Sequence, residues 1–341
     1  MSISVPDSIY CCRERLRQCL ENNTHTIVLA IDGIHLDIAR QCWPEAKTEQ
    51  LETVFPTTSS TGWLSSLTGQ TIHQHRVPGV VFRPTSNAPL INVWEYDGDE
   101  IPIPEHNIFT DAIMLGYQTV AINGDFLPVT GRWTQALFAH CQKTCPERFF
   151  TAPALDIPQK VHHVTTCIDS FLNTSEPTFI WCFIDTDLHI HRYGYDQDLC
   201  DFLTQLGKQA EQWQTQGYQV IAYSDHGLVP TRHDIDIANT IEKIADNFNL
   251  QTGGAGRTRW LYTSSEQENE IIDTLRQALP TEIQVISQRQ IFTQFDPRIG
   301  RVLIIAGGEN FICPAEYIYE HGSRLPEEMQ VPFTYWRPYG R

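Results

Sequence analysis

The stretch "TFIWCFIDTDLHIHRYG", residues 178 to 194, decides the fold. Its first seven residues carry no charge and are almost all apolar, which is typical of a strand buried on both faces of a parallel sheet. The run ends in Asp185 and Asp187, and His189 and His191 follow. Side chains that commonly bind metal ions therefore come directly after a strand that belongs in a core.

The same kind of strand recurs along the chain. Apolar runs at 26–32, 117–123 and 218–224 alternate with segments of helical spacing, such as 198–217. This alternation predicts an α/β fold in which helices flank a mostly parallel sheet. We expect one domain over residues 1–341, with a smaller lobe inserted at about 230–300.

Two further strand ends carry acids. "AIDG" places Asp32 after the first strand, and "YSDHG" places Asp225 and His226 after the strand at 218–224. Because open α/β sheets bind ligands beyond the carboxyl ends of their strands, we expect these side chains to gather at one edge. Mixed carboxylate and imidazole ligands favour Zn²⁺ or Mn²⁺.

The spacing of the acids and histidines in the opening stretch leaves two alternatives. Asp187 and His191 are four residues apart, and so are Asp185 and His189. In a helix, either spacing puts both side chains on one face, where they can hold one ion. Local geometry does not choose between the two pairs.

A hydroxyl cluster lies in "VFPTTSSTGWLSSLTG", residues 54 to 69. It leads into a predicted helix that ends at Gly69, so one of these residues is expected to cap the helix. A second interpretation is a nucleophile, because the positive end of the helix dipole stabilises an alkoxide and attracts phosphate.

Composition narrows the classes of partner and compartment. The net charge of −17 disfavours binding to duplex nucleic acid. No apolar run approaches the roughly 20 residues that cross a bilayer, and the N-terminus has no secretory pattern, so we expect no membrane association. The ten cysteines are expected to be free thiols in a reducing cytoplasm.

Taken in order, the motifs resemble a known set. Asp-Gly follows the first strand, Phe-Pro-Thr-x-Ser precedes a helix that ends in Thr-Gly, and Asp-x-x-x-His-x-x-Gly, Ser-Asp-His-Gly and a late His-Gly before Glu-Met-x-x-Pro complete the series. Over residues 32–332 the chain resembles the alkaline phosphatase superfamily, most closely its type I phosphodiesterase/nucleotide pyrophosphatase branch. The resemblance implies a three-layer α/β/α sandwich.

The resemblance also implies a set of site residues and a reaction. One metal ion would be held by Asp187, His191 and His321, and a second by Asp32, Asp225 and His226. Both ions are divalent, with zinc favoured and manganese an alternative. Ser59 would be the nucleophile and would form a seryl-phosphate intermediate. The resemblance thus favours Asp187 and His191 over Asp185 and His189.

Two positions depart from the family pattern. Arg76 replaces the Gly of a family His-Gly, and Val80 stands about where nucleotide pyrophosphatases have a phosphate-binding Asn. Arg76 or Arg257 is the candidate replacement for that contact with the substrate.

The implied function is hydrolysis of a small phosphoester by a phosphodiesterase, and a nucleotide-like substrate is one option. A phosphomonoesterase or a phosphotransferase of the same superfamily is the alternative, and a non-catalytic metal-binding protein is a weaker one. The oligomeric state is left open.

Overall fold

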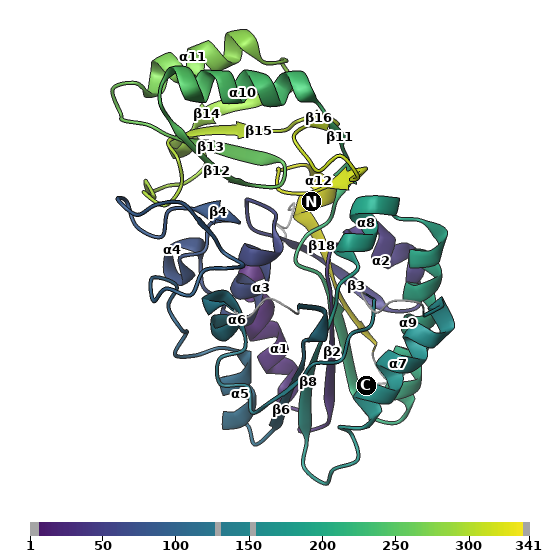
Figure 1. Cartoon of the computed structure of the whole chain (residues 1–341). Helices are drawn as coiled ribbons and strands as arrows, with labels where there is room; N and C mark the ends of the chain where they lie inside the picture. Colours follow the sequence, from purple (N-terminus) through teal and green to yellow (C-terminus); the bar gives the residue numbers. More distant parts are fainter. Residues whose placement is uncertain (1–6, 127–130, 151–154, 337–341) are drawn as a thin grey trace, which may run out of the picture.

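A computed structural model describes residues 7–126, 131–150 and 155–336. Its main sheet has eight strands (Figure 1). In spatial order they are β1 (Asp7–Ser8), β3 (Lys47–Glu52), β18 (Gln330–Trp336), β9 (Gln219–Tyr223), β2 (Thr26–Ile31), β8 (Thr178–Ile184), β6 (Gln118–Ile122) and β7 (Lys143–Cys145). Only β18 runs against its neighbours, and the other strands share one direction. The predicted, mostly parallel sheet is confirmed.

Helices cover both faces of this sheet (Figure 1). One face carries η1 (Ile9–Cys11), α1 (Cys12–Leu20), α3 (Ser59–Thr68), α5 (Ile108–Met114) and α6 (Arg132–Leu137), and the other carries α2 (Leu36–Cys42), α7 (Ile157–Asp169) and α9 (Gln197–Thr215). Strand β8 shows the reason: Phe179, Trp181 and Phe183 enter the first core, and the residues between them enter the second. The expected three-layer sandwich is confirmed.

A second, smaller sheet forms a separate lobe (Figure 1). Its antiparallel strands are, in order, β14 (Gln284–Ser287), β15 (Val302–Ile305), β13 (Thr258–Tyr262), β12 (Gln251–Ala255), β4 (Val81–Phe82) and β5 (Ile91–Asn92). Helices α10 (Ile235–Asn247) and α11 (Glu268–Ala278) pack on it through a core of their own. This sheet therefore combines strands from the block expected at about 230–300 with β15 and with two short strands from residues 81–92.

Short elements complete the described chain. They are α4 (Ile72–His75), η2 (Gly124–Phe126), α8 (Asp187–Tyr193), β10 (Val229–Pro230), β11 (Arg232–His233), η3 (Gln288–Gln290), β16 (Asn310–Phe311), β17 (Tyr319–Glu320) and α12 (Pro326–Met329). The pairing of β10 with β17 brings the late His-Gly segment beside the strand that follows His226. Within the described ranges, no helix combines the length and the apolar character needed to cross a bilayer.

Replacing Phe179 tests the contribution of the first core layer to stability. The Phe179 side chain is fully buried and packs edge-on against Phe109 at a centroid distance of 5.9 Å. Phe179→Ala should leave a cavity and cost about 3–5 kcal/mol, which would lower the thermal unfolding midpoint by several degrees. Met114→Ala is the control, because Met114 is 78% exposed and its loss should shift the midpoint little.

Candidate metal centre and nucleophile

The register of three parallel strands brings the predicted acids together. Ile31 of β2 pairs with Ile184 of β8, and Ala30 of β2 pairs with Tyr223 of β9. Asp32 therefore lies level with Asp185 on one side and with Asp225 on the other, just past the end of each strand. Because parallel strands end at the same edge, carboxyl groups that are far apart in sequence become neighbours.

Helix α8 decides between the two alternatives left open by spacing. Asp187 is its first residue, and the Nε2 atom of His191 lies 2.9 Å from Asp187 Oδ2 one turn later. His189 lies on another side of the helix, where its Nε2 atom is 2.9 Å from Asp196 Oδ1. The carboxylate of Asp185 accepts a hydrogen bond from the Leu188 N–H at 3.2 Å. The geometry brings Asp187 and His191 together at the cluster.

The third residue of the first group arrives from the far end of the chain. His321 follows β17, and its Nε2 atom lies 3.8 Å from Asp187 Oδ1. Ligand atoms of Asp187, His191 and His321 all lie within 4.8 Å of one another, close enough to share one ion. This is the trio that the resemblance implied for one metal.

A second group surrounds Asp32. The Nε2 atom of His226 is 3.4 Å from Asp32 Oδ1 and 3.4 Å from Asp225 Oδ2. Asp32, His226 and again Asp187 have ligand atoms within 4.8 Å of one another. The structure thus places all six implied ligands in one cluster, but Asp187 lies between the two groups and Asp225 sits beside His226 at the margin of the second.

Backbone carbonyls orient the three imidazoles. The Nδ1–H group of His191 donates to the Tyr319 carbonyl at 2.8 Å, and that of His321 donates to the Thr57 carbonyl at 2.6 Å. The Nδ1 atom of His226 lies 3.3 Å from the Gly227 carbonyl. Since a carbonyl only accepts, the proton in each of these contacts is on Nδ1, and each Nε2 atom is directed at the carboxylates, the position from which a neutral imidazole binds a metal ion.

The charges in the cluster are unbalanced. Asp32 and Asp225 are buried, and burial together with the neighbouring carboxylates raises the pKa of both. Among the ion pairs of the described residues, none joins a lysine or arginine to Asp32, Asp187 or Asp225. Both Asp225 oxygens and Asp187 Oδ1 are buried without a hydrogen-bond partner. Divalent cations would satisfy these oxygens and remove the repulsion, so the residues fit a metal centre.

Burial and neighbouring charged groups also set the pKa values of His191 and His226. Burial favours a neutral His191, but the Asp187 carboxylate outweighs it and raises the pKa of His191 to about 9. Burial and the nearby His321 lower the pKa of His226. His226 is thus a neutral imidazole, the form that binds metals.

Ser59 is the hydroxyl residue that reaches the cluster. It is the first residue of α3, and its Oγ atom lies 3.3 Å from Asp32 Oδ1 and 3.1 Å from His226 Nε2. The Ser60 hydroxyl instead donates to the Gly79 carbonyl. Gly62 lets the helix approach this closely, because a Cβ atom there would lie 2.8 Å from Asp225 Cβ.

Sequence reasoning missed two residues that shape the centre. The Trp63 indole N–H donates to Asp32 Oδ2 at 3.1 Å and is fully buried. Trp63 follows Ser59 by one helical turn, so the predicted helix could have indicated it. Glu320 is the other: its Oε1 atom lies 3.8 Å from His191 Nδ1 and 3.6 Å from His321 Nε2. Its place beside His321 in sequence was the available signal.

The two arginines considered for substrate binding have different surroundings, and the backbone N–H of Arg257 donates to the His321 carbonyl at 2.7 Å. Arg76 is exposed at the end of α4, in a left-handed conformation. The Arg257 guanidinium is buried, donates to Thr231 and to the Gly308 carbonyl, and faces Glu328 at 3.8 Å. Val80 donates its N–H to the Gly254 carbonyl beside the smaller sheet. In the described chain, no ion pair links either guanidinium to Asp32, Asp187 or Asp225.

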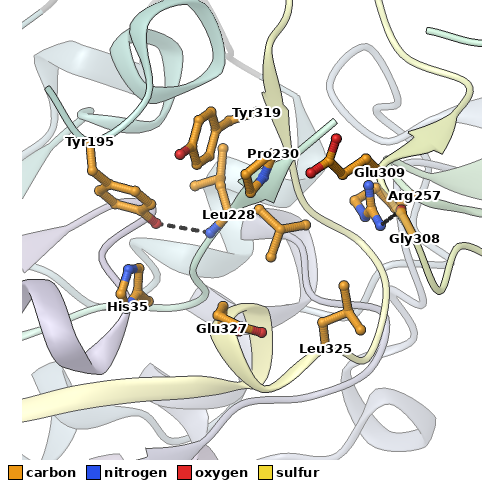
Figure 2. Close-up of a pocket in the computed structure, with 11 residues that line it drawn as sticks. His35, Tyr195, Leu228, Pro230, Arg257, Gly308, Glu309, Tyr319, Leu325 and Glu327 are labelled. Atoms are coloured by element: carbon orange, nitrogen blue, oxygen red, sulfur yellow. Dashed lines mark hydrogen bonds between the residues drawn. The ribbon is translucent and has the colours of Figure 1, made fainter. Parts of the chain in front are cut away.

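A cavity of about 290 Å³ lies behind the loops that carry the ligands (Figure 2). Its wall includes Tyr195, whose hydroxyl donates to the Gly33 carbonyl at 2.7 Å and accepts the Leu228 N–H at 2.9 Å. These bonds tie together the loops after Asp32 and His226. The cavity therefore borders the supports of the centre, with Leu228 and Tyr319 in its wall (Figure 2).

Comparison with known proteins agrees with this geometry. The family model for type I phosphodiesterase/nucleotide pyrophosphatase matches residues 44–336. Murine ectonucleotide pyrophosphatase/phosphodiesterase 5 has a similar fold, with a TM-score of 0.67, 14% identity, and coverage of 92% of this chain and 88% of that chain. An inactive variant of the murine protein in complex with AMP gives a TM-score of 0.64 at 14% identity, with coverage of 91% and 87%.

A bacterial enzyme has a comparable fold. Phosphonoacetate hydrolase from Sinorhizobium meliloti 1021, in complex with phosphonoacetate, gives a TM-score of 0.67 at 14% identity, with coverage of 94% of this chain and 92% of that chain. A search of curated protein sequences returned no match. At this level of identity, the solved structures support the fold alone.

Exchanging the two histidines of α8 tests the assignment of the metal ligands. His191→Asn should weaken Zn²⁺ binding more than about tenfold, because it removes an imidazole from the cluster. His189→Asn should leave Zn²⁺ affinity nearly unchanged, since His189 faces Asp196. Metal content after dialysis against buffered zinc measures both. A larger loss of zinc in His189→Asn than in His191→Asn would instead assign Asp185 and His189 as the metal ligands.

A tryptophan pair tests whether Trp63 positions Asp32. Trp63→Phe keeps an aromatic ring but removes the N–H donor, so Zn²⁺ affinity should fall about tenfold. Trp181→Phe is the matched control: Trp181 is equally buried, contacts Trp63 at 5.5 Å, and donates to the Tyr223 hydroxyl instead. Equal effects of the two changes on zinc affinity would reduce the role of Trp63 to packing.

Proposed function

This chain belongs to the type I phosphodiesterase/nucleotide pyrophosphatase family, and on that premise we propose that it is a metal-dependent phosphodiesterase with a seryl-phosphate intermediate. Membership of this family confirms that the chain belongs with enzymes that hydrolyse phosphoester bonds, as expected. The observation that carries the finer proposal is the position of Ser59 Oγ, between Asp32 and His226 at the start of a helix.

The proposed metal ligands are the six acids and imidazoles of the cluster. Asp187, His191 and His321 would hold one divalent ion, and Asp32, Asp225 and His226 a second, with Asp187 near both. Zinc is favoured over manganese because three of the six ligands are imidazoles. When bound, such ions polarise phosphoryl oxygens and stabilise attacking and leaving oxygens of an in-line displacement.

The residues of the chain orient the nucleophile. Ser59 Oγ would form a bond to phosphorus while the bond to the leaving oxygen breaks, and the hydroxyl proton would pass through solvent to the leaving alcohol; Asp32 and His226 contact Oγ and orient it. A water molecule then cleaves the Oγ–P bond and restores the serine. The Thr61 N–H already donates to the Thr58 carbonyl, so the N–H groups of Ser59 and Ser60 at the start of α3 would bind a phosphate oxygen where the family uses Asn.

The charge distribution supports a diester over a monoester. A phosphodiester carries one negative charge, whereas a monoester carries up to two near neutral pH. Among the contacts of the described residues, no lysine or arginine bonds to Ser59 or to the carboxylates of the centre. We propose a small, nucleotide-like diester: the charge distribution favours the diester, and the AMP complex of the murine protein supports only the nucleotide-like part.

The cysteines bear on the compartment. None of the ten cysteines forms a disulfide bond, and the sulfur atoms of Cys145 and Cys167 lie 3.9 Å apart as thiols. This arrangement supports the proposal of a reducing, cytoplasmic location.

Ser59→Ala tests the proposed nucleophile. Hydrolysis of bis(p-nitrophenyl) phosphate by zinc-loaded protein should fall at least about a thousandfold, because no hydroxyl remains to attack phosphorus. Zinc content should stay near that of the wild type. Ser60→Ala is the control, since its hydroxyl bonds to Gly79 and not to the cluster.

The same assay separates the reaction classes. Wild-type protein should hydrolyse the bis-ester faster than p-nitrophenyl phosphate, and a chelator should abolish both rates. Full activity in Ser59→Ala would remove the seryl intermediate from the scheme, and a faster monoester reaction would favour the phosphomonoesterase alternative.

A further inference from the structure

A second cavity lies at one end of the smaller sheet. Antiparallel pairing of Gln251 with Tyr262, and of Leu261 with Val302, brings the end of β13 beside the starts of β12 and β15. Residues that flank these strand ends, together with Arg83 just after β4, line a cavity of about 480 Å³. None of the cluster residues described above belongs to its lining.

The charge of this cavity is opposite to that of the whole chain. Its lining contains Arg83 and Arg301, and no Asp or Glu is found among the described residues that line it. The chain as a whole has a net charge of −17. The Glu268 carboxylate pairs with Arg301 at 3.5 Å, but Glu268 does not line the cavity. An acidic protein thus concentrates two cations with hydroxyl and amide groups in one hollow.

Aromatic rings hold both guanidinium groups in place. Arg83 lies over the Tyr262 ring at 4.4 Å, and Arg301 lies over the Phe295 ring at 4.1 Å. The Tyr262 ring is itself fixed, because its hydroxyl donates to the Arg298 carbonyl and accepts a hydrogen bond from the backbone N–H of Arg83. Stacked guanidinium groups are flat, rigid donors for phosphate and leave an outer face for another ring.

Two buried polar atoms of the lining lack partners. Arg83 Nε and Thr263 Oγ1 are both buried, and neither has a hydrogen-bond partner among the described residues. The Arg83 guanidinium donates from Nη2 to Gln251 Oε1 at 2.8 Å and from Nη1 to the Ser86 carbonyl at 3.3 Å, which orients the side chain but leaves Nε unused. Buried polar groups are nearly always satisfied in folded proteins, so these two atoms are open to a further hydrogen-bond partner.

From these observations, we propose that the cavity is a binding site for a small organic phosphate that carries a flat ring, such as a nucleoside monophosphate. The phosphate would accept hydrogen bonds from Arg83, Arg301 and Thr263, and the ring would stack on a guanidinium face. The site is independent of the proposed reaction, because it shares no residue with the metal centre.

Titration calorimetry with AMP tests the site on the full chain, both zinc-loaded and in EDTA. One equivalent should bind in EDTA, because the site needs no metal, and the zinc-loaded protein should keep this equivalent in addition to any AMP bound at the metal centre. Arg83→Gln combined with Arg301→Gln should weaken that binding at least tenfold, and Thr263→Val should weaken it less. Hydrolysis of bis(p-nitrophenyl) phosphate by the double variant should stay within twofold of the wild type.

Controls separate local contacts from net charge and from folding. Arg289→Gln removes an exposed charge of the same lobe outside the lining, and it should change AMP affinity less than twofold. Adenosine, which has the ring without the anion, should bind at least tenfold more weakly than AMP. The proposal is overturned if AMP does not bind in EDTA, if the double variant with an unchanged unfolding midpoint binds as well as the wild type, or if adenosine or inorganic phosphate binds as tightly as AMP.

Discussion

The parallel register of β9, β2 and β8 is the constraint on which the site depends. It places the residue after each strand at one height, so Asp32 has acidic neighbours on both sides. The two hydrophobic cores hold these strands rigidly, and the carboxylates cannot move apart. The fold therefore builds an unfavourable charge cluster into its own edge, and its buried oxygens without partners are the physical reason to infer cations there.

Helix α3 links the core to the chemistry. Trp63 packs edge-on against Trp181, Phe183 and Tyr223, and the same ring donates a hydrogen bond to Asp32. Ser59 lies one turn earlier, so the packing that fixes Trp63 also fixes the proposed nucleophile. Support from the other side comes from the Thr57 carbonyl, which orients His321. The proposed nucleophile and the candidate ligands are thus positioned by the same packed elements, which suits a reaction that depends on orientation.

The two lobes carry opposite electrostatic features. The main sheet ends in carboxylates, whereas the smaller sheet ends in a cavity lined by Arg83 and Arg301. The loop that precedes β15 also reaches the main lobe, where Phe292 lies 6.1 Å from Phe55 and Asp296 faces His73 at 3.1 Å. The loop that contributes Phe295 to the arginine-lined cavity therefore also contacts the segment that precedes Ser59.

The sequence by itself determined the architecture and indicated the candidate site residues. Uncharged strand runs such as 178–184, helical spacing at 198–217 and acids after three strands were enough for a mostly parallel sheet with its ligands at one edge. These signals are patterns within single segments, so they can be recognised in the sequence before the fold is known.

Tertiary structure decided which atoms meet. Helical spacing alone could not separate Asp187 and His191 from Asp185 and His189; the direction of α8 did, by turning His189 to Asp196. The shared position of Asp187, the bond from Trp63, the partners of Arg257 and the arginine-lined cavity all depend on contacts between distant segments. Such contacts follow from how sheets and helices pack in three dimensions, and no pattern along a single segment contains that information.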